Sequence, residues 1–182
     1  INDSMLIPVL LNIVKGYVGD IIINDEESIL IKELKTYDKE IISIKIIDCL
    51  VLDSDDDLSI GNKLFRIHKK IERVEGDVKL IGNMSCMFYN SKFNSDISGW
   101  DVSSVTDMYR MFLDSKFTSD ISGWDVSSVK NMSCMFYYSK FTGDISDWDV
   151  SLVKNMSDMF RNSKFSKSNL HLLPLKCREL FE

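Results

Sequence analysis

Residues 100–123 read WDVSSVTDMYRMFLDSKFTSDISG, and residues 124–147 read WDVSSVKNMSCMFYYSKFTGDISD. Two further copies of this 24-residue pattern cover residues 76–99 and 148–169. A fixed period of about 20 to 50 residues is typical of proteins in which each copy buries its apolar face against its neighbours. The repeat therefore predicts a stack of similar coils over the second half of the chain.

Large apolar side chains recur at the 24-residue interval, and we expect them to form the core. The columns are Trp100/Trp124/Trp148, Met84/Met108/Met132/Met156, Phe88/Phe112/Phe136/Phe160 and Phe93/Phe117/Phe141/Phe165. The flexible methionine thioether fills irregular gaps between packed elements, which suits a column of this kind. Large aromatic side chains also bury most of their area in folded proteins.

Each copy is expected to hold one short helix and one short strand. Apolar residues from Val105 to Ser115 follow the spacing of one helical face. Ser103, Ser127 and Ser151 precede that stripe and are expected to cap the helices. Residues 115–122 alternate like a strand with Ile121 pointing inward. The predicted fold is an α/β repeat solenoid, leucine-rich-repeat-like, with a mixed α/β amino-terminal domain or cap.

The repeat resembles the leucine-rich-repeat variant of Bacteroides surface protein A-like (BspA-like) proteins. The matching pattern is W-D-V-S-S-V-x-x-M-x-x-M-F-x-x-S-K-F-x-x-D-I-S, as in residues 100–122, and the resemblance covers about residues 76–165. It implies a repeat solenoid, with adhesion or partner binding as the expected role. Such proteins occur in bacteria, protists, phages and large viruses, so the resemblance also implies a cell-surface or virion location.

The two ends of the array are expected to differ from the repeats. Residues 1–75 are assigned to a mixed domain or cap, with strands expected at residues 20–24, 28–34 (alternatively helical) and 41–52. Residues 170–182 (HLLPLKCRELFE preceded by Leu170) are expected to form a final turn and short helix over Phe160 and Phe165. Terminal coils need such caps, since each exposes an unpaired edge.

The composition of the chain argues against two classes of partner, nucleic acids and membranes. The chain has 182 residues, 45% of them apolar and 27% charged, with a net charge of −6. Without a basic stripe to neutralise phosphates, nucleic-acid binding is not expected. The longest early apolar run, residues 5–14, is shorter than the about 20 residues that a membrane helix needs, so membrane insertion is not expected either. The chain begins with Ile, so a processed amino terminus stays possible.

Four cysteines are present, at positions 49, 86, 134 and 177. Cys86 and Cys134 hold the same repeat position two copies apart, which places them roughly 10 Å apart at a rise of about 4.8 Å per coil. A disulfide needs Cα atoms within about 7 Å, so no bridge is expected between them. Two free thiols favour a reducing compartment, in contrast to the surface location that the resemblance implies.

The column Asp96/Asp120/Asp144 has two interpretations. Stacked carboxylates could hold calcium between coils, as some repeat proteins do. Alternatively, each carboxylate accepts hydrogen bonds from amides of its own turn, beside the column Lys92/Lys116/Lys140/Lys164. We favour the second interpretation, because the glycine-dense loops of calcium repeats are absent. No metal site and no cofactor are therefore predicted.

The Trp column also has two interpretations. An exposed ladder of indoles could stack on sugar rings or on a partner. Burial at the corner of each coil is the interpretation we favour, for the reason given above.

The sequence offers little chemistry for catalysis. His68 and His171 lie far apart in the chain, and the cysteines form no C-x-x-C pair. Neither a phosphate-binding glycine loop nor a G-x-S-x-G elbow occurs. An enzyme would need a site within residues 1–75, and none is predicted.

The leading hypothesis is a non-enzymatic, adhesin-like binding module whose coils present a surface to a protein or glycan partner. The candidate partner-binding residues are Asp96, Ser98, Asp120, Ser122, Asp144 and Ser146. The alternative is a structural component of a virion or cell-surface assembly. The sequence does not fix the oligomeric state or the identity of the partner.

Overall fold

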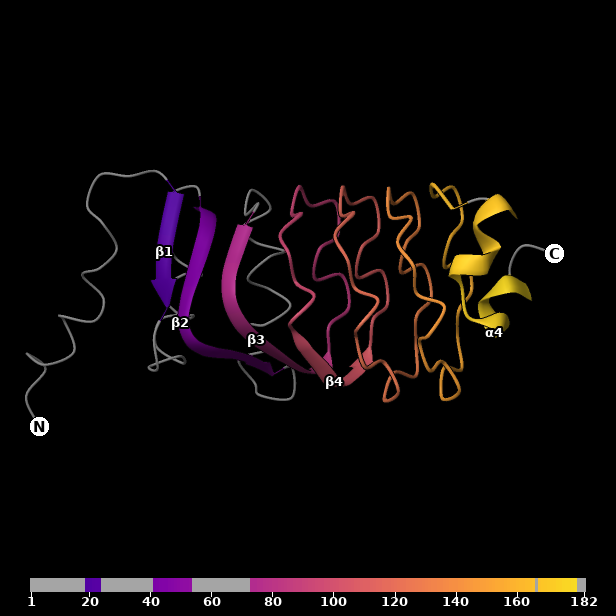
Figure 1. Ribbon diagram of the computed structural model, residues 1–182, viewed down its shortest axis with the longest axis horizontal. Helices are drawn as coiled ribbons and strands as arrows, with labels where there is room; N and C mark the ends of the chain where they lie inside the picture. The colour runs from indigo at the N-terminus through magenta and orange to yellow at the C-terminus, as the bar shows by residue number, and fades with distance from the viewer. Residues whose placement is uncertain (1–18, 24–40, 54–72, 166, 180–182) are drawn as a thin grey trace, which may run out of the picture.

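The computed structural model of the chain describes residues 19–23, 41–53, 73–165 and 167–179. The strand expected at residues 28–34 and His68 lie outside these ranges. Four strands form one parallel sheet in the order β1-β2-β3-β4 (Figure 1). Their bounds are Gly19–Ile23 for β1, Ile41–Asp53 for β2, Arg73–Asn83 for β3 and Asp101–Asp107 for β4.

The strands expected near residues 20–24 and 41–52 are confirmed as β1 and β2. Both are rich in β-branched residues, which suit a pleated surface. β2 pairs with β3, with Leu50 opposite Val78, and β3 pairs with β4, with Gly82 opposite Val105. The same parallel ladder therefore runs from the amino-terminal part of the chain into the repeats.

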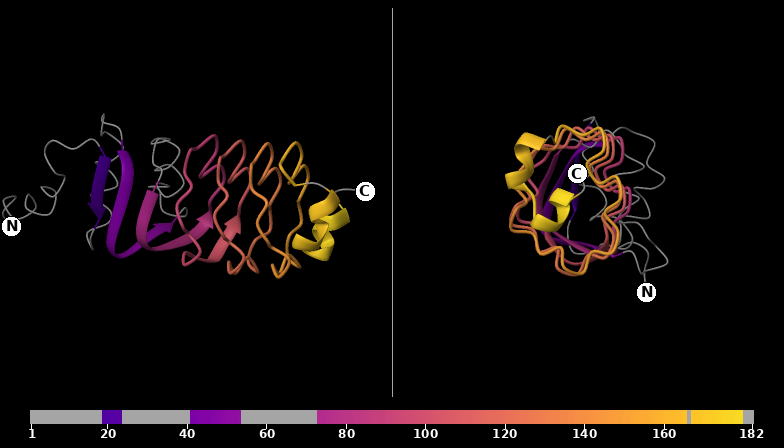
Figure 2. Two further views of the ribbon diagram at one scale, coloured as in Figure 1. Left: turned by 45° about the horizontal axis from the view of Figure 1, so that its top comes forward. Right: turned by 90° about the vertical axis from the view of Figure 1, so that its right-hand side faces the viewer.

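Beyond β4 the ladder narrows to single bridges, which pair Asp107 with Asn131 and Asn131 with Asn155. The repeats nevertheless lie one behind another, so that in the end view their traces follow a single outline (Figure 2). We call residues 84–165 in this arrangement the coil stack. Backbone hydrogen bonds join its neighbours at an offset of about one repeat, for example Phe112 N to Met135 O at 2.9 Å.

The predicted α/β solenoid with one strand and one helix in each coil is wrong. Residues 105–115 do not form a helix: β4 covers their beginning, and tight turns with positive φ at Arg110 (54°) and Asp114 (52°) cover the rest. Two such turns in succession also direct residues at helical spacing inward, as Met108, Met111 and Phe112 show by their complete burial. The apolar spacing alone therefore cannot distinguish these turns from a helix.

The predicted strand at residues 115–122 is also wrong, although Ile121 does point inward and is fully buried. The predicted caps are wrong as well. Instead of accepting hydrogen bonds at helix starts, Ser103 and Ser127 donate their backbone N–H groups to Asp101 and Asp125, each at 3.0 Å. The aspartate is the acceptor that closes each turn, as in an Asx turn.

Helical segments in the described residues occur only at the carboxyl-terminal end. A 3-10 helix, η1, spans Lys167–Leu172, and α4 spans Leu175–Arg178 (Figure 1). The expected final turn and short helix are therefore confirmed, and their expected position over Phe160 and Phe165 stays a prediction. Leu172 O accepts the N–H of Ile145 at 2.9 Å, which attaches this cap to the third copy.

The core is the set of apolar columns that the repeat predicts. Stacked phenylalanine rings run along the stack, with centroids 5.2 Å apart for Phe88–Phe112 and 5.6 Å apart for both Phe112–Phe136 and Phe136–Phe160. The three indoles are at most 5% exposed, which confirms burial of the Trp column. Each of the last two also uses its N–H: Trp124 Nε1 donates to Ile97 O and Trp148 Nε1 to Ile121 O, both at 3.0 Å.

We predict that Phe112→Ala lowers the free energy of unfolding by about 3 to 5 kcal/mol, because it removes a fully buried ring from the middle of a column. Tyr138→Ala is the matched control: this side chain is 55% exposed, so the expected loss is below about 0.5 kcal/mol. Urea unfolding monitored by circular dichroism measures both. Equal losses in the two variants would contradict the central role of the Phe column.

Candidate functional site

The predicted partner-binding residues lie on one exposed side of the stack, here called the Asp–Ser face and made up of Asp96, Ser98, Asp120, Ser122, Asp144 and Ser146. All six are exposed or half-buried. Each aspartate accepts the backbone N–H of the serine two residues later, at distances of 3.0, 2.9 and 2.9 Å along the column. The interpretation that these carboxylates bond to their own turns is confirmed.

These hydrogen bonds also determine the charge state of the face. The backbone N–H of the following serine, with its hydroxyl next in importance, lowers the pKa of Asp96, Asp120 and Asp144. Opposing this, Asp96 and Asp144 raise the pKa of Asp120 by charge repulsion, but the hydrogen bonds outweigh them. The carboxylates stay ionised, as stacked charges can when each has a hydrogen-bond donor.

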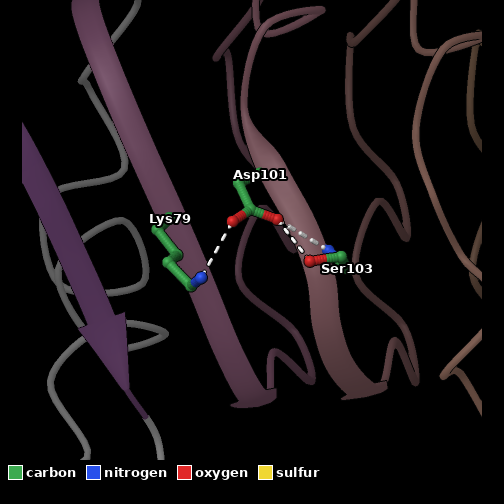
Figure 3. Close-up of polar contacts among 3 residues, drawn as sticks. All are labelled: Lys79, Asp101 and Ser103. Carbon is green, nitrogen blue, oxygen red and sulfur yellow. Dashed lines mark hydrogen bonds and ion pairs between the residues drawn. The ribbon is translucent and has the colours of Figure 1, made fainter.

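A second aspartate column consists of Asp101, Asp125 and Asp149. Their carboxylates close the turn that precedes the residues whose backbone N–H groups bond to the next coil. Its best-connected member is Asp101, whose carboxylate accepts from Ser103 Oγ at 2.6 Å and pairs with Lys79 Nζ at 3.0 Å (Figure 3). The Ser103 hydroxyl first, and then Lys79, lower the pKa of Asp101 to about 2. The sequence analysis assigned the capping role to the serines and not to the aspartates, because serine and aspartate are both common in turns.

A different surface carries most of the chemical variety of the repeats. We call it the turn face, and it consists of four positions in each coil that belong to the positive-φ turns. The positions hold Ser85/Tyr109/Ser133/Ser157, Cys86/Arg110/Cys134/Asp158, Tyr89/Leu113/Tyr137/Arg161 and Asn90/Asp114/Tyr138/Asn162. Apart from Ser133, which is buried, these side chains are exposed or half-buried.

Aromatic rings and guanidinium groups are close neighbours on the turn face. Tyr137 and Tyr138 meet edge to face with ring centroids 4.8 Å apart. The Arg110 guanidinium lies 4.7 Å from the centre of the Tyr109 ring. At the last coil, Arg161 pairs with Asp158 at 3.3 Å. Sequence reasoning missed this surface, because it considered only residues that recur from copy to copy. The available signal was the set of repeat positions at which the residue changes from copy to copy.

The described residues offer little for metal or acid–base chemistry. Among them, no group of three or more His, Cys, Asp or Glu side chains is arranged to hold a metal ion. His171 is exposed on the cap, where its charge contributes to lowering the pKa of Asp144. None of the helices in the described ranges is long and apolar enough to cross a membrane.

The lowered pKa of Asp101 predicts a pH dependence of stability. A carboxyl group whose pKa is lower in the folded state stabilises the fold above its unfolded value of 3.8, and this contribution is lost as the pH falls toward the folded value of about 2. We therefore expect the melting temperature to fall between about pH 4 and pH 2, and Asp101→Asn to reduce that fall. The amide should still close the turn, as Asn131 Oδ1 does for Ser133 N at 3.1 Å.

Ser103→Ala is the partner variant for that experiment. It keeps the Asp101 charge but removes the hydroxyl that contributes most to the pKa shift, so it should also flatten the pH profile. Thermal unfolding followed by circular dichroism from pH 6 to pH 2 gives the profiles. Identical slopes in all three proteins would show that Asp101 does not contribute to acid sensitivity.

The cysteines are expected to differ in reactivity. Cys86 and Cys134 are half-buried and free, whereas Cys177 is fully buried, and burial raises the pKa of its thiol to about 11. Because the thiolate is the reactive form, iodoacetamide at pH 8 should label Cys86 and Cys134 at least about ten times faster than Cys177. Peptide mass spectrometry measures the rates. Fast labelling of Cys177 in the folded protein would contradict the packing of the cap.

Comparison with known proteins gives one finding. Residues 62–172 match the family described as Mycoplasma protein of unknown function, DUF285, a match that covers more than half of the chain. No curated protein and no solved structure matches the chain. The resemblance to BspA-like repeats is not tested by these comparisons and stays a prediction.

Proposed function

We propose that this chain, which belongs to the DUF285 family of Mycoplasma proteins of unknown function, is a non-enzymatic protein-binding module whose turn face contacts the partner. The observation that supports this most is the contrast between the inside and the outside of the coils. The buried columns repeat almost without change, whereas the turn-face positions differ from coil to coil. Packing of the core explains why the buried residues repeat, but it does not explain why the turn-face residues vary.

The kind of variation favours a protein over a repeating glycan. A polymer with a regular repeat would be matched by identical columns of side chains, and the identical Asp–Ser columns are already explained by the turns that they close. A protein surface has no period, so a matching surface must vary along the stack. Tyrosine and arginine also dominate the binding energy of protein interfaces, and both are frequent on the turn face.

Rigidity supports the same role. The turn face is built on backbone that is hydrogen-bonded to the next coil, as with Tyr138 N, which donates to Arg161 O at 3.1 Å. Side chains on such a backbone lose little freedom on binding, which lowers the entropic cost of association. The aromatic pair Tyr137 and Tyr138 is the best candidate for the centre of the contact, since the ring of Tyr138 is 55% exposed and supported by its neighbour.

The test compares variants of the two faces in a quantitative pull-down with mass spectrometry. We expect Tyr137→Ala/Tyr138→Ala to lower partner recovery at least about tenfold, a loss typical of a binding hot spot. Asp120→Asn/Ser122→Tyr changes the Asp–Ser face, keeps an acceptor for the turn amide and should leave recovery unchanged. Circular dichroism confirms that both variants are folded.

The outcomes separate the competing assignments. Loss of recovery only in the Asp–Ser variant would move the binding site to the residues predicted from the sequence. Binding to a glycan array would contradict a protein partner. Self-association in light scattering that the tyrosine variant abolishes would favour the alternative of a structural component in an assembly.

A further inference from the structure

Four exposed lysines form a column along the stack, here called the lysine column: Lys92, Lys116, Lys140 and Lys164. Each precedes a buried phenylalanine in the chain, so its own side chain points outward. Backbone hydrogen bonds hold the column in register, because the N–H groups of Lys116, Lys140 and Lys164 donate to a serine carbonyl one coil earlier at 3.2, 3.4 and 3.0 Å. The adjoining phenylalanine rings lie 6.5, 6.1 and 6.1 Å apart from coil to coil. The column is therefore a row of regularly spaced positive charges.

The fold gives no reason for a lysine in every copy. The exposed positions two residues before and two residues after it vary, as Asn90/Asp114/Tyr138/Asn162 and as Asn94/Thr118/Thr142. The ion pairs within the described part of the chain involve Lys79 and Arg161, and none of them involves a lysine of the column. Like charges that face each other on neighbouring strands are destabilising. Four identical charges kept in register thus indicate a role outside the fold.

The lysine column borders the proposed centre of the turn face. Lys140 follows Tyr138 by two residues, so their Cα atoms are at most about 7 Å apart. Both side chains are exposed, whereas Ser139 between them is buried. A partner that covers the Tyr138 ring therefore comes within reach of the Lys140 ammonium group. Covering that charge without supplying an anion would be costly, so the partner has to carry negative charge beside the tyrosines.

We propose, building on the protein-binding role proposed above, that the lysine column binds an acidic segment of the protein partner. Carboxylates of that segment pair with successive lysines along the stack. Alternate residues of an extended segment lie about 6.6 Å apart, and residues four apart in a helix rise by about 6 Å. Either conformation can therefore present one carboxylate to each coil, given the ring spacing of 6.1 to 6.5 Å beside the lysines.

A densely charged polymer such as polyphosphate fits this surface less well. Asp96, Asp120 and Asp144 follow the lysines by four residues, so a column of carboxylates runs along the same segments. The chain as a whole also carries a net charge of −6. A polymer of high negative charge is repelled by both. A polypeptide carries its carboxylates singly and can place uncharged side chains next to the aspartates.

Fluorescence anisotropy with a synthetic peptide tests the column. The probe is a fluorescein-labelled peptide in which glutamate and serine alternate, titrated with the full chain at low ionic strength. We expect Lys116→Gln/Lys140→Gln to weaken binding at least about fivefold, because two ion pairs are lost, and to reduce the effect of salt on affinity. Lys130→Gln/Lys154→Gln is the matched control: both lysines are exposed and the net charge changes equally, so the expected effect is below about twofold.

The controls separate this proposal from the tyrosine contact. A peptide with glutamine in place of glutamate should not bind. The glutamate peptide has no aromatic ring, so Tyr137→Ala/Tyr138→Ala should bind it as the unchanged chain does, whatever the pull-down shows for that variant. Three results would overturn the proposal: no binding at millimolar glutamate peptide, equal weakening by the two lysine pairs, or tighter binding of polyphosphate of the same total charge. Circular dichroism confirms that the lysine variants are folded.

Discussion

The structure depends on backbone hydrogen bonds that run along the stack from one coil to the next. Three successive phenylalanines of one column, Phe88, Phe112 and Phe136, each donate their N–H to a carbonyl of the following coil at 2.9 Å. A helix would satisfy these amides within itself and leave the coils joined by side chains alone. Because the amides point outward along the stack, every coil is both a hydrogen-bonding template and a hydrophobic surface for its neighbour.

Left-handed backbone is what orients those amides. Among the residues that the structure describes, eight other than glycine have positive φ, and two of them occur in each coil. Such a conformation costs about 1 to 2 kcal/mol for most residues, and it persists only where the surrounding structure compensates. Here the cross-coil hydrogen bonds and the stacked rings compensate together. The same geometry turns the side chains of these positions away from the core, which places the variable residues of the repeats on a rigid surface.

The two ends of the stack follow from the same constraint. Parallel stacking leaves both N–H and C=O groups unpaired at each end, so each end needs partners of its own. At the carboxyl-terminal end, the Lys176 ammonium group donates to Val150 O and Val153 O. The cap is thus a partial substitute for a coil.

The sequence by itself determined the period, the identity of the core columns, the burial of the tryptophans and the hydrogen bonding of Asp96, Asp120 and Asp144 within their own turns. Each of these follows from local spacing, which the repeat displays several times. Only the tertiary structure decided the backbone conformation between Val105 and Ser115, because a helix and a pair of left-handed turns place apolar residues at the same spacing. The difference lies in where the amides find their acceptors, and those acceptors belong to a neighbouring coil 23 residues away, as for Phe112 and Met135. The turn face depends on that choice, so sequence reasoning could not locate it.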